Sequence, residues 1–138
     1  MFLKSVEVIG FKSFPDRTKL TFDSGMTAIV GPNGSGKSNI SDAMRWVLGE
    51  QAPKALRIER TEDIIFAGTT QKKPLGYAQA TITIANGDGA LKTGTDEVVI
   101  SRKYYRSGKI ILSPAVFGIC LGIFFFLGGK TSRDIFPV

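Results

Sequence analysis

The sequence predicts an α/β fold in which one strand, a glycine-rich loop and one helix stand beside a small antiparallel β-lobe. Short runs of β-forming residues recur on both sides of a single helical segment. In that segment, residues 38–48, apolar side chains recur at i, i+3, i+4 and i+7, the spacing of a helix with one buried face. The apolar run 26–30 leads into glycine-rich residues and then into this helix.

Turn and breaker residues place the individual elements. A turn around Pro15 and Asp16 separates the first two expected strands. Residues 26–30 are all uncharged β-formers, which predicts a strand buried on both faces. Gly49 can end the helix, and the Asn-Gly-Asp-Gly run at 86–89 is typical of a turn. The expected strands are residues 3–9, 19–22, 26–30, 63–67, 79–85 and 97–104.

Composition excludes several function classes. The 138 residues suffice for one small domain, and 43% hydrophobic against 22% charged residues excludes global disorder. Because the chain has no histidine, it cannot form a His-ligated metal site or a Ser-His-Asp triad. One cysteine, Cys120, excludes an internal disulfide and favours a reducing compartment. The first residues lack the apolar core of a signal peptide, so a cytoplasmic location is expected.

Residues 31–38 match the pattern G-x-x-x-x-G-K-[S/T] in full. Glycines let the backbone curl, at positive φ where required, so that successive N–H groups point into one concavity at the helix N-terminus. Lys37 would reach the β- and γ-phosphates of a nucleotide, and Ser38 would place its hydroxyl on Mg²⁺. A chance match in a glycine- and serine-rich turn is the alternative. The candidate nucleotide-binding residues here are Gly31, Pro32, Asn33, Gly34, Ser35, Gly36, Lys37, Ser38 and the adjoining Asn39.

Three segments carry a more specific pattern than the loop alone: IGFKSF (9–14), GMTAIVGPNGSGKSNISDAMRWVLGEQ (25–51) and EDIIFAGT (62–69). Together they resemble the N-terminal ATPase head of the SMC proteins, the chromosome condensation and partition ATPases, and most of all the bacterial form. The resemblance runs through about residue 108 and includes YYRSG at 104–108. DNA-repair relatives share the loop and the early segment, whereas WVLGEQ and DIIFAG favour SMC proteins proper.

The resemblance implies ATP and Mg²⁺ as ligands and assigns further residues. Lys12 and Ser13 match the early loop that approaches the phosphates and sugar, and Asn33 would contact the γ-phosphate or a water. Arg57 matches an arginine implicated in stimulating ATP hydrolysis when two heads engage on DNA. Asp63 and Ile64 fall in the stretch expected near the base. An ordinary loop lysine and a solvated arginine remain the alternatives for Lys12 and Arg57.

The resemblance also implies a P-loop NTPase half-domain that is incomplete without a C-terminal lobe. In the family the glutamine loop follows this segment, and the signature motif, the Walker B aspartate and the catalytic glutamate come from a second half-head. We therefore expect weak ATP binding and no turnover from this chain alone. DNA and a second head are the implied partners of the intact parent. Its basic residues face either DNA or solvent: Lys54, Arg57, Arg60, Lys72 and Lys73.

The composition changes abruptly near residue 109, which predicts a boundary between a head segment, 1–108, and an apolar tail, 109–138. Residues 110–129 carry no charge and are long enough to span a bilayer as a helix, with Gly118 and Gly122 at a spacing that allows close helix packing. Four glycines and Pro114 are unfavourable for such a span, and membrane association is not expected of an SMC head. A membrane-anchored P-loop protein and a fragment of an ABC-type repair or transport ATPase stay open as alternatives.

A frameshift is the favoured explanation of the tail. After YYRSG the family usually continues into Pro-Cys-Arg-Leu-Lys/Arg-Asp. Read from the third base of the Ser113 codon, the codons of residues 113–119 permit Pro-Cys-Arg-Leu-Arg-Asp. The hypothesis is a net insertion or deletion near codons 109–112, which would make the tail an out-of-frame translation. Sequencing the locus past the stop codon would test it.

Overall fold

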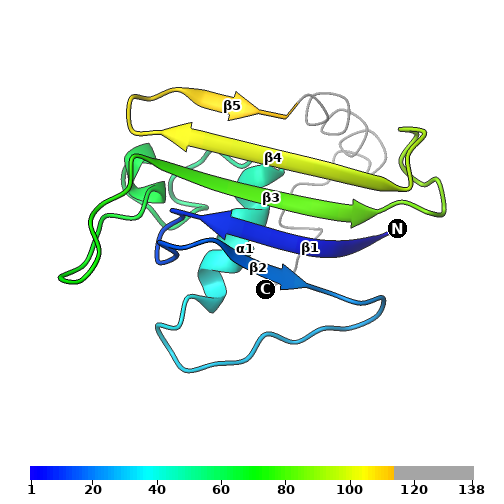
Figure 1. Ribbon diagram of the computed structural model, residues 1–138, viewed down its shortest axis with the longest axis horizontal. Helices are drawn as coiled ribbons and strands as arrows, with labels where there is room; N and C mark the ends of the chain where they lie inside the picture. Colours follow the sequence, from blue (N-terminus) through cyan, green and yellow to red (C-terminus); the bar gives the residue numbers. More distant parts are fainter. Residues whose placement is uncertain (114–138) are drawn as a thin grey trace.

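The computed structural model describes residues 1–113, which form one twisted sheet with a helix across one face (Figure 1). Neighbouring strands are antiparallel throughout, in the order β2-β1-β3-β4-β5. The register pairs Val6 with Ile82 and Ile82 with Ile100, so their side chains share the face that is buried. The strands are β1 Phe2–Ile9, β2 Thr18–Thr21, β3 Tyr77–Ala85, β4 Glu97–Tyr105 and β5 Ile110–Leu112.

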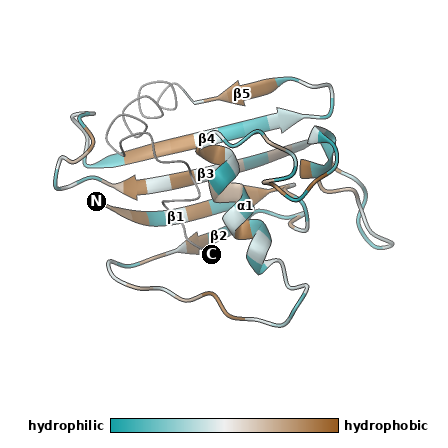
Figure 2. Cartoon of the chain, turned by 180° about the vertical axis from the view of Figure 1, so that it is seen from behind, coloured by the Kyte–Doolittle hydropathy of each residue, from teal (hydrophilic) through white to brown (hydrophobic). Residues whose placement is uncertain are grey.

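The helix α1, Lys37–Val47, packs its apolar side against β1, β3 and β4 (Figure 2). Trp46 is buried there, with its ring centroid 5.5 Å from that of Phe11. A short 3₁₀ helix, η1 Thr61–Ile64, follows and buries Ile64. Burial of these large side chains fixes the helix against the sheet and thereby fixes the position of the loop that precedes it.

Most of the expected elements are confirmed, and two expectations are wrong. The strands expected at 3–9, 19–22, 79–85 and 97–104 and the helix expected at 38–48 are present, with ends that differ by at most two residues. The strand expected at 63–67 is instead the end of η1 followed by a single bridge between Ile65 and Phe11. The turn at 86–89 is present. The Asn86 side chain also ties the following loop to this turn, because it accepts from the Leu91 amide and donates to the Leu91 and Thr95 carbonyl oxygens.

The predicted buried strand at residues 26–30 is also wrong. These residues form neither helix nor strand, and Met26 and Val30 are 100% and 87% exposed. A strand forms only when a neighbour accepts and donates its backbone hydrogen bonds. The five-stranded sheet of residues 1–113 ends at β2 and β5, and neither strand pairs with this segment. The apolar run therefore has β propensity without a pairing partner.

The structure bears on part of the predicted tail. Residues 110–112 form β5, which was not predicted, and pair with β4 through Arg102–Leu112, Lys103–Ile111 and Tyr104–Ile110. Residues 114–138, including Cys120, Gly118 and Gly122, lie outside the described residues. Among residues 1–113 no helix is long and apolar enough to cross a membrane. The boundary at 108/109 and the frameshift both stay predictions.

Candidate phosphate-binding site

The loop at residues 31–38 has the backbone geometry that its glycines were expected to supply. Gly34 and Gly36 adopt φ values of +81° and +91°, which only glycine reaches without strain. A Cβ at Gly36 would lie 2.9 Å from the Ser13 Oγ and 3.1 Å from the Phe14 ring. A Cβ at Gly31 would lie 3.0 Å from the Ser35 Oγ. The loop therefore needs glycine both for its curl and for the close approach of neighbouring groups.

The amides at the start of α1 are available to a ligand. Gly36 is the N-cap residue, and no side chain of the described residues 1–113 caps the helix there. The amides of Gly36, Lys37 and Ser38 donate to no carbonyl oxygen among the loop and turn hydrogen bonds of residues 1–113. First-turn amides lack partners within a helix, and together with the helix dipole they attract anions. The backbone therefore fits a phosphate group.

The ammonium of Lys37 lies back over its own loop. Its Nζ donates to the carbonyl oxygens of Gly31 and Pro32, the latter at 2.7 Å, and lies 3.5 Å from the Ser35 Oγ. These contacts hold a positive charge beside the curled backbone. Because carbonyl oxygens bind an ammonium less strongly than phosphate oxygens do, a phosphate can replace one of them.

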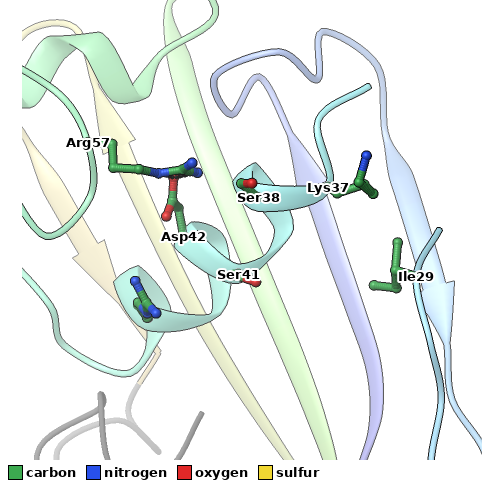
Figure 3. Close-up of a pocket in the computed structure, with 7 residues that line it drawn as sticks. Ile29, Lys37, Ser38, Ser41, Asp42 and Arg57 are labelled. Atoms are coloured by element: carbon green, nitrogen blue, oxygen red, sulfur yellow. Dashed lines mark hydrogen bonds and ion pairs between the residues drawn. The ribbon is translucent and has the colours of Figure 1, made fainter. Parts of the chain in front are cut away.

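A cavity of about 350 Å³ lies beside the first turns of the helix (Figure 3). The helix contributes a polar stripe to it, since Ser38, Ser41, Asp42 and Arg45 follow one another at i, i+3, i+4 and i+7. Ser38 is exposed, and its hydroxyl makes no hydrogen bond within residues 1–113, as a metal ligand would require. The lining residues are Ile29, Lys37, Ser38, Ser41, Asp42, Arg45 and Arg57.

The early loop contacts α1 through both of its polar residues, which are directed to different parts of the helix. The Asn39 Nδ2 donates to the Ser13 Oγ at 2.8 Å, so Ser13 lies at the junction of the glycine-rich loop and α1. The Lys12 Nζ instead donates to the Asp42 Oδ2 at 2.5 Å and to the Leu56 carbonyl oxygen. Lys12 thus lies in an ion pair under the helix, with its side chain only 10% exposed.

Arg57 lines the same cavity as the loop. Its side chain is 51% exposed and donates to the Asp42 Oδ2 through Nε at 3.2 Å and Nη2 at 2.6 Å. Figure 3 shows the guanidinium lying against this carboxylate, near Ser38 and across the helix start from Lys37. The Arg57 side chain is therefore fixed by an ion pair with Asp42 and is not a freely solvated charge.

The remaining candidates lie apart from the cavity lining. Asn33 is exposed on the loop. Asp63 accepts from the amides of Glu59 and Arg60, at 3.2 and 2.8 Å, and so caps η1. Ile64 is buried, and its carbonyl oxygen accepts from the Lys12 amide at 2.7 Å. The structure thus connects Ile64 to the early loop through the backbone.

Sequence reasoning missed Asp42, which is the best-buried acidic side chain of residues 1–113 and contacts two cations of the site. A signal was present. Asp42 falls between Ile40 and Ala43 on the inward side of an amphipathic helix, where a carboxylate is costly unless it is paired. It also lies four residues after Ser38, which places both on one helix face.

The comparisons with known proteins agree with this geometry. Residues 2–113 match the family model described as the RecF/RecN/SMC N terminal domain. The chain belongs to this family. The match covers the sheet, the glycine-rich loop and the helix. Because the family model includes RecF and RecN, the SMC resemblance of the sequence is confirmed by the individual relatives.

Individual relatives place the chain within the SMC branch. It is 58% identical over 109 residues to the chromosome partition protein Smc of Clostridium kluyveri, a match that covers 79% of this chain and 9% of the relative. A solved structure from work on ATP-driven dimerization and DNA-stimulated activation of SMC ATPases superposes with a TM-score of 0.83 at 34% identity, covering 100% of this chain and 85% of that one. A second, an Smc head bound to the C-winged helix domain of ScpA, gives a TM-score of 0.81 at 38% identity, with 91% and 40% covered.

Two facts follow from these matches. The fold of residues 1–113 is that of part of an SMC head, a five-stranded antiparallel sheet with one α-helix. The chain spans about 9% of the length of the chromosome partition proteins that it matches.

Proposed function

We propose that this chain binds ATP together with Mg²⁺ through residues 31–38, as the N-terminal part of an SMC-type ATPase head. The observation that carries the proposal is the group of amides at Gly36, Lys37 and Ser38, which donate to no carbonyl oxygen among the loop and turn hydrogen bonds of residues 1–113 and lie with the Lys37 ammonium at the N-terminus of α1. Such an arrangement offers several N–H donors and a positive charge to one phosphate group.

The residues have distinct roles in this proposal. Lys37 neutralises the β- and γ-phosphates, and the Ser38 hydroxyl holds Mg²⁺, which supplies further positive charge to the same phosphates. Ser13 and Asn39, joined by their hydrogen bond, border the loop at the ribose and phosphate side. Nucleotide contacts from Lys12, Asn33, Asp63 and Ile64 are further parts of the proposal, and they rest on family resemblance.

The function of a longer protein that contains this segment is proposed only from what its relatives do. Its relatives are chromosome partition proteins, and one matched structure concerns SMC ATPases that dimerise with ATP and are activated by DNA. We propose the same context here: a cytoplasmic ATPase of chromosome condensation and partition, in which two heads engage on DNA. Because the other catalytic motifs of the family lie in a second half-head, the 138-residue chain is expected to bind ATP without steady turnover.

An equilibrium titration tests nucleotide binding. The 138-residue chain is titrated with a fluorescent ribose-labelled ATP in the presence of Mg²⁺, and Lys37→Ala is expected to weaken binding at least about tenfold. Lys19→Ala is the matched control, because Lys19 is an exposed lysine on β2 and its loss changes the net charge equally. Equal affinities of wild type and Lys37→Ala, or no binding at all, would contradict the proposal.

Magnesium and turnover are tested separately. Ser38→Ala is expected to reduce the gain in ATP affinity that Mg²⁺ provides, while affinity in EDTA stays the same. Phosphate release by the wild-type chain is expected to stay at the background of Lys37→Ala. Steady hydrolysis that disappears in Lys37→Ala would overturn the expectation that this chain is catalytically incomplete.

A further inference from the structure

One buried carboxylate beside the cavity holds two cations. Asp42 is 1% exposed, and its Oδ2 accepts from the Lys12 Nζ at 2.5 Å and from the Arg57 Nη2 at 2.6 Å. Lys12 is also fixed by the Leu56 carbonyl oxygen. Three ionised groups therefore meet at one oxygen, with a net charge of plus one at neutral pH.

The geometry leaves one side of the guanidinium unused. Arg57 presents its Nε and Nη2 to Asp42, and among residues 1–113 its Nη1 makes no hydrogen bond. A guanidinium carries five N–H donors in a rigid plane, so the edge that holds a carboxylate and the edge that binds a second anion can be occupied at once. The side chain is half exposed and lines the cavity with Lys37 and Ser38.

Charge neutrality alone does not require Arg57. Lys12 is close enough to Asp42 to compensate the buried carboxylate, and its own side chain is nearly buried. Arg57, like Lys12, is held in place at a backbone cost. Lys12 and Arg57 are the two non-glycine residues of 1–113 with positive φ, at +48° and +53°. Such strain persists where the surrounding contacts over-determine a conformation, and it is frequent at ligand sites.

We propose that Asp42 is a positioning residue, which holds the guanidinium of Arg57 at the cavity wall so that its unused N–H edge binds a phosphate oxygen of the nucleotide. The inference rests on the proposed function and names a determinant of that same site. Lys12 holds Asp42 in place, Asp42 orients Arg57, and Arg57 contacts the ligand. This arrangement explains why a carboxylate lies beside a site for an anion.

A double-mutant cycle tests the order of these contacts. The 138-residue chain and the variants Asp42→Asn, Arg57→Ala and Asp42→Asn/Arg57→Ala are titrated with fluorescent ATP and Mg²⁺. Asp42→Asn and Arg57→Ala are each expected to weaken binding about tenfold, the effect of losing a well-placed hydrogen bond to a charged group. The double variant is expected to bind no more weakly than Arg57→Ala, because Asp42 acts through Arg57.

The cycle has a matched control on the other face of the sheet. Arg17 is an exposed arginine that pairs with Glu7 at 2.7 Å, and neither residue lines the cavity. Arg17→Ala and Glu7→Gln remove the same charges and the same kind of ion pair. Both are expected to leave ATP affinity unchanged, which separates the position of Arg57 from its charge.

Thermal melting checks that each variant is folded. Two further variants keep the test decisive if Asp42→Asn does not fold. Asp42→Glu is expected to restore much of the affinity, because its carboxylate can still reach Arg57. Arg57→Lys is expected to bind as weakly as Arg57→Ala, since an ammonium lacks a second planar edge. Wild-type affinity in Arg57→Lys overturns the inference.

The outcomes separate this inference from the proposed function. If wild type binds ATP and Lys37→Ala does not, but Asp42→Asn weakens binding equally with and without Arg57, then Asp42 is merely structural and the inference fails alone. If wild type binds no ATP, both fail. Loss of the Asp42→Asn effect in the Arg57→Ala background supports both.

Discussion

The guanidinium of Arg102 lies 5.0 Å from the ring centroid of Trp46 and donates through Nη1 to the Trp46 carbonyl oxygen at 2.8 Å. The same nitrogen donates to the Glu50 carbonyl oxygen at 3.1 Å. Arg102 comes from β4 and Trp46 from the last turn of α1, so one buried side chain joins the sheet to the end of the helix. A cation at this end also complements the helix dipole.

Replacing Arg102 with methionine is expected to lower the free energy of unfolding by about 2–4 kcal/mol, because two carbonyl oxygens lose a charged donor and the indole loses its cation. Arg106→Met is the control. Arg106 also donates to a carbonyl oxygen, that of Leu75 at 3.0 Å, but from an exposed position. Urea titration followed by circular dichroism measures both, and equal midpoints would show that Arg102 does not fasten the helix.

A second prediction concerns the two glycines with positive φ in the loop. Gly36→Ala is expected to abolish ATP binding, because its Cβ would lie 2.9 Å from the Ser13 Oγ in addition to the unfavourable φ of +91°. Gly34→Ala meets nothing within 4 Å and carries only the conformational cost of φ +81°, about 1–2 kcal/mol. Its ATP affinity is expected to fall less. Titration of both variants with fluorescent ATP compares their affinities. A larger loss of affinity in Gly34→Ala than in Gly36→Ala would contradict the loop geometry.

A third prediction concerns the chain's N-terminus. The N-terminal ammonium donates to Asp88, and together with the Ala90 amide it lowers the pKa of this carboxyl below its ordinary value of 3.8. A carboxyl whose pKa is lowered by folding stabilises the fold above its unfolded pKa, and this contribution is lost as the pH falls through the lowered value. The pair is exposed, so salt is expected to reduce the shift.

Carbon-detected NMR titration of Asp88 measures this shift. The midpoint is expected below 3.8 in the unmodified chain and closer to 3.8 once the N-terminus is acetylated, because acetylation removes the positive charge. In melting experiments, Asp88→Asn should differ from wild type above about pH 4 and converge with it in more acidic solution. An identical midpoint before and after acetylation would show that the ammonium does not contact Asp88 in solution.

Local signals in the sequence predicted the loop, the helix and four strands because each depends on neighbouring residues. Glycine spacing defines the loop, apolar periodicity defines α1, and alternation defines β3 and β4. The role of Asp42 could not be predicted in the same way. Its partners Lys12 and Arg57 lie 30 and 15 residues away and meet it only once the helix has packed on the sheet. Sequence reasoning treated these cations separately and missed the carboxylate between them.

The segment 26–30 shows the opposite failure, since its β propensity is real but has no pairing strand within residues 1–113. A final prediction tests this difference between pattern and burial. Val30→Thr, at an 87% exposed side chain, is expected to change the free energy of unfolding by less than about 0.5 kcal/mol. Val6→Thr makes the same isosteric change at 2% exposure and is expected to cost about 1–3 kcal/mol, because it buries a hydroxyl among apolar side chains. Urea unfolding compares the two, and equal losses would mean that residues 26–30 are buried in the folded chain after all.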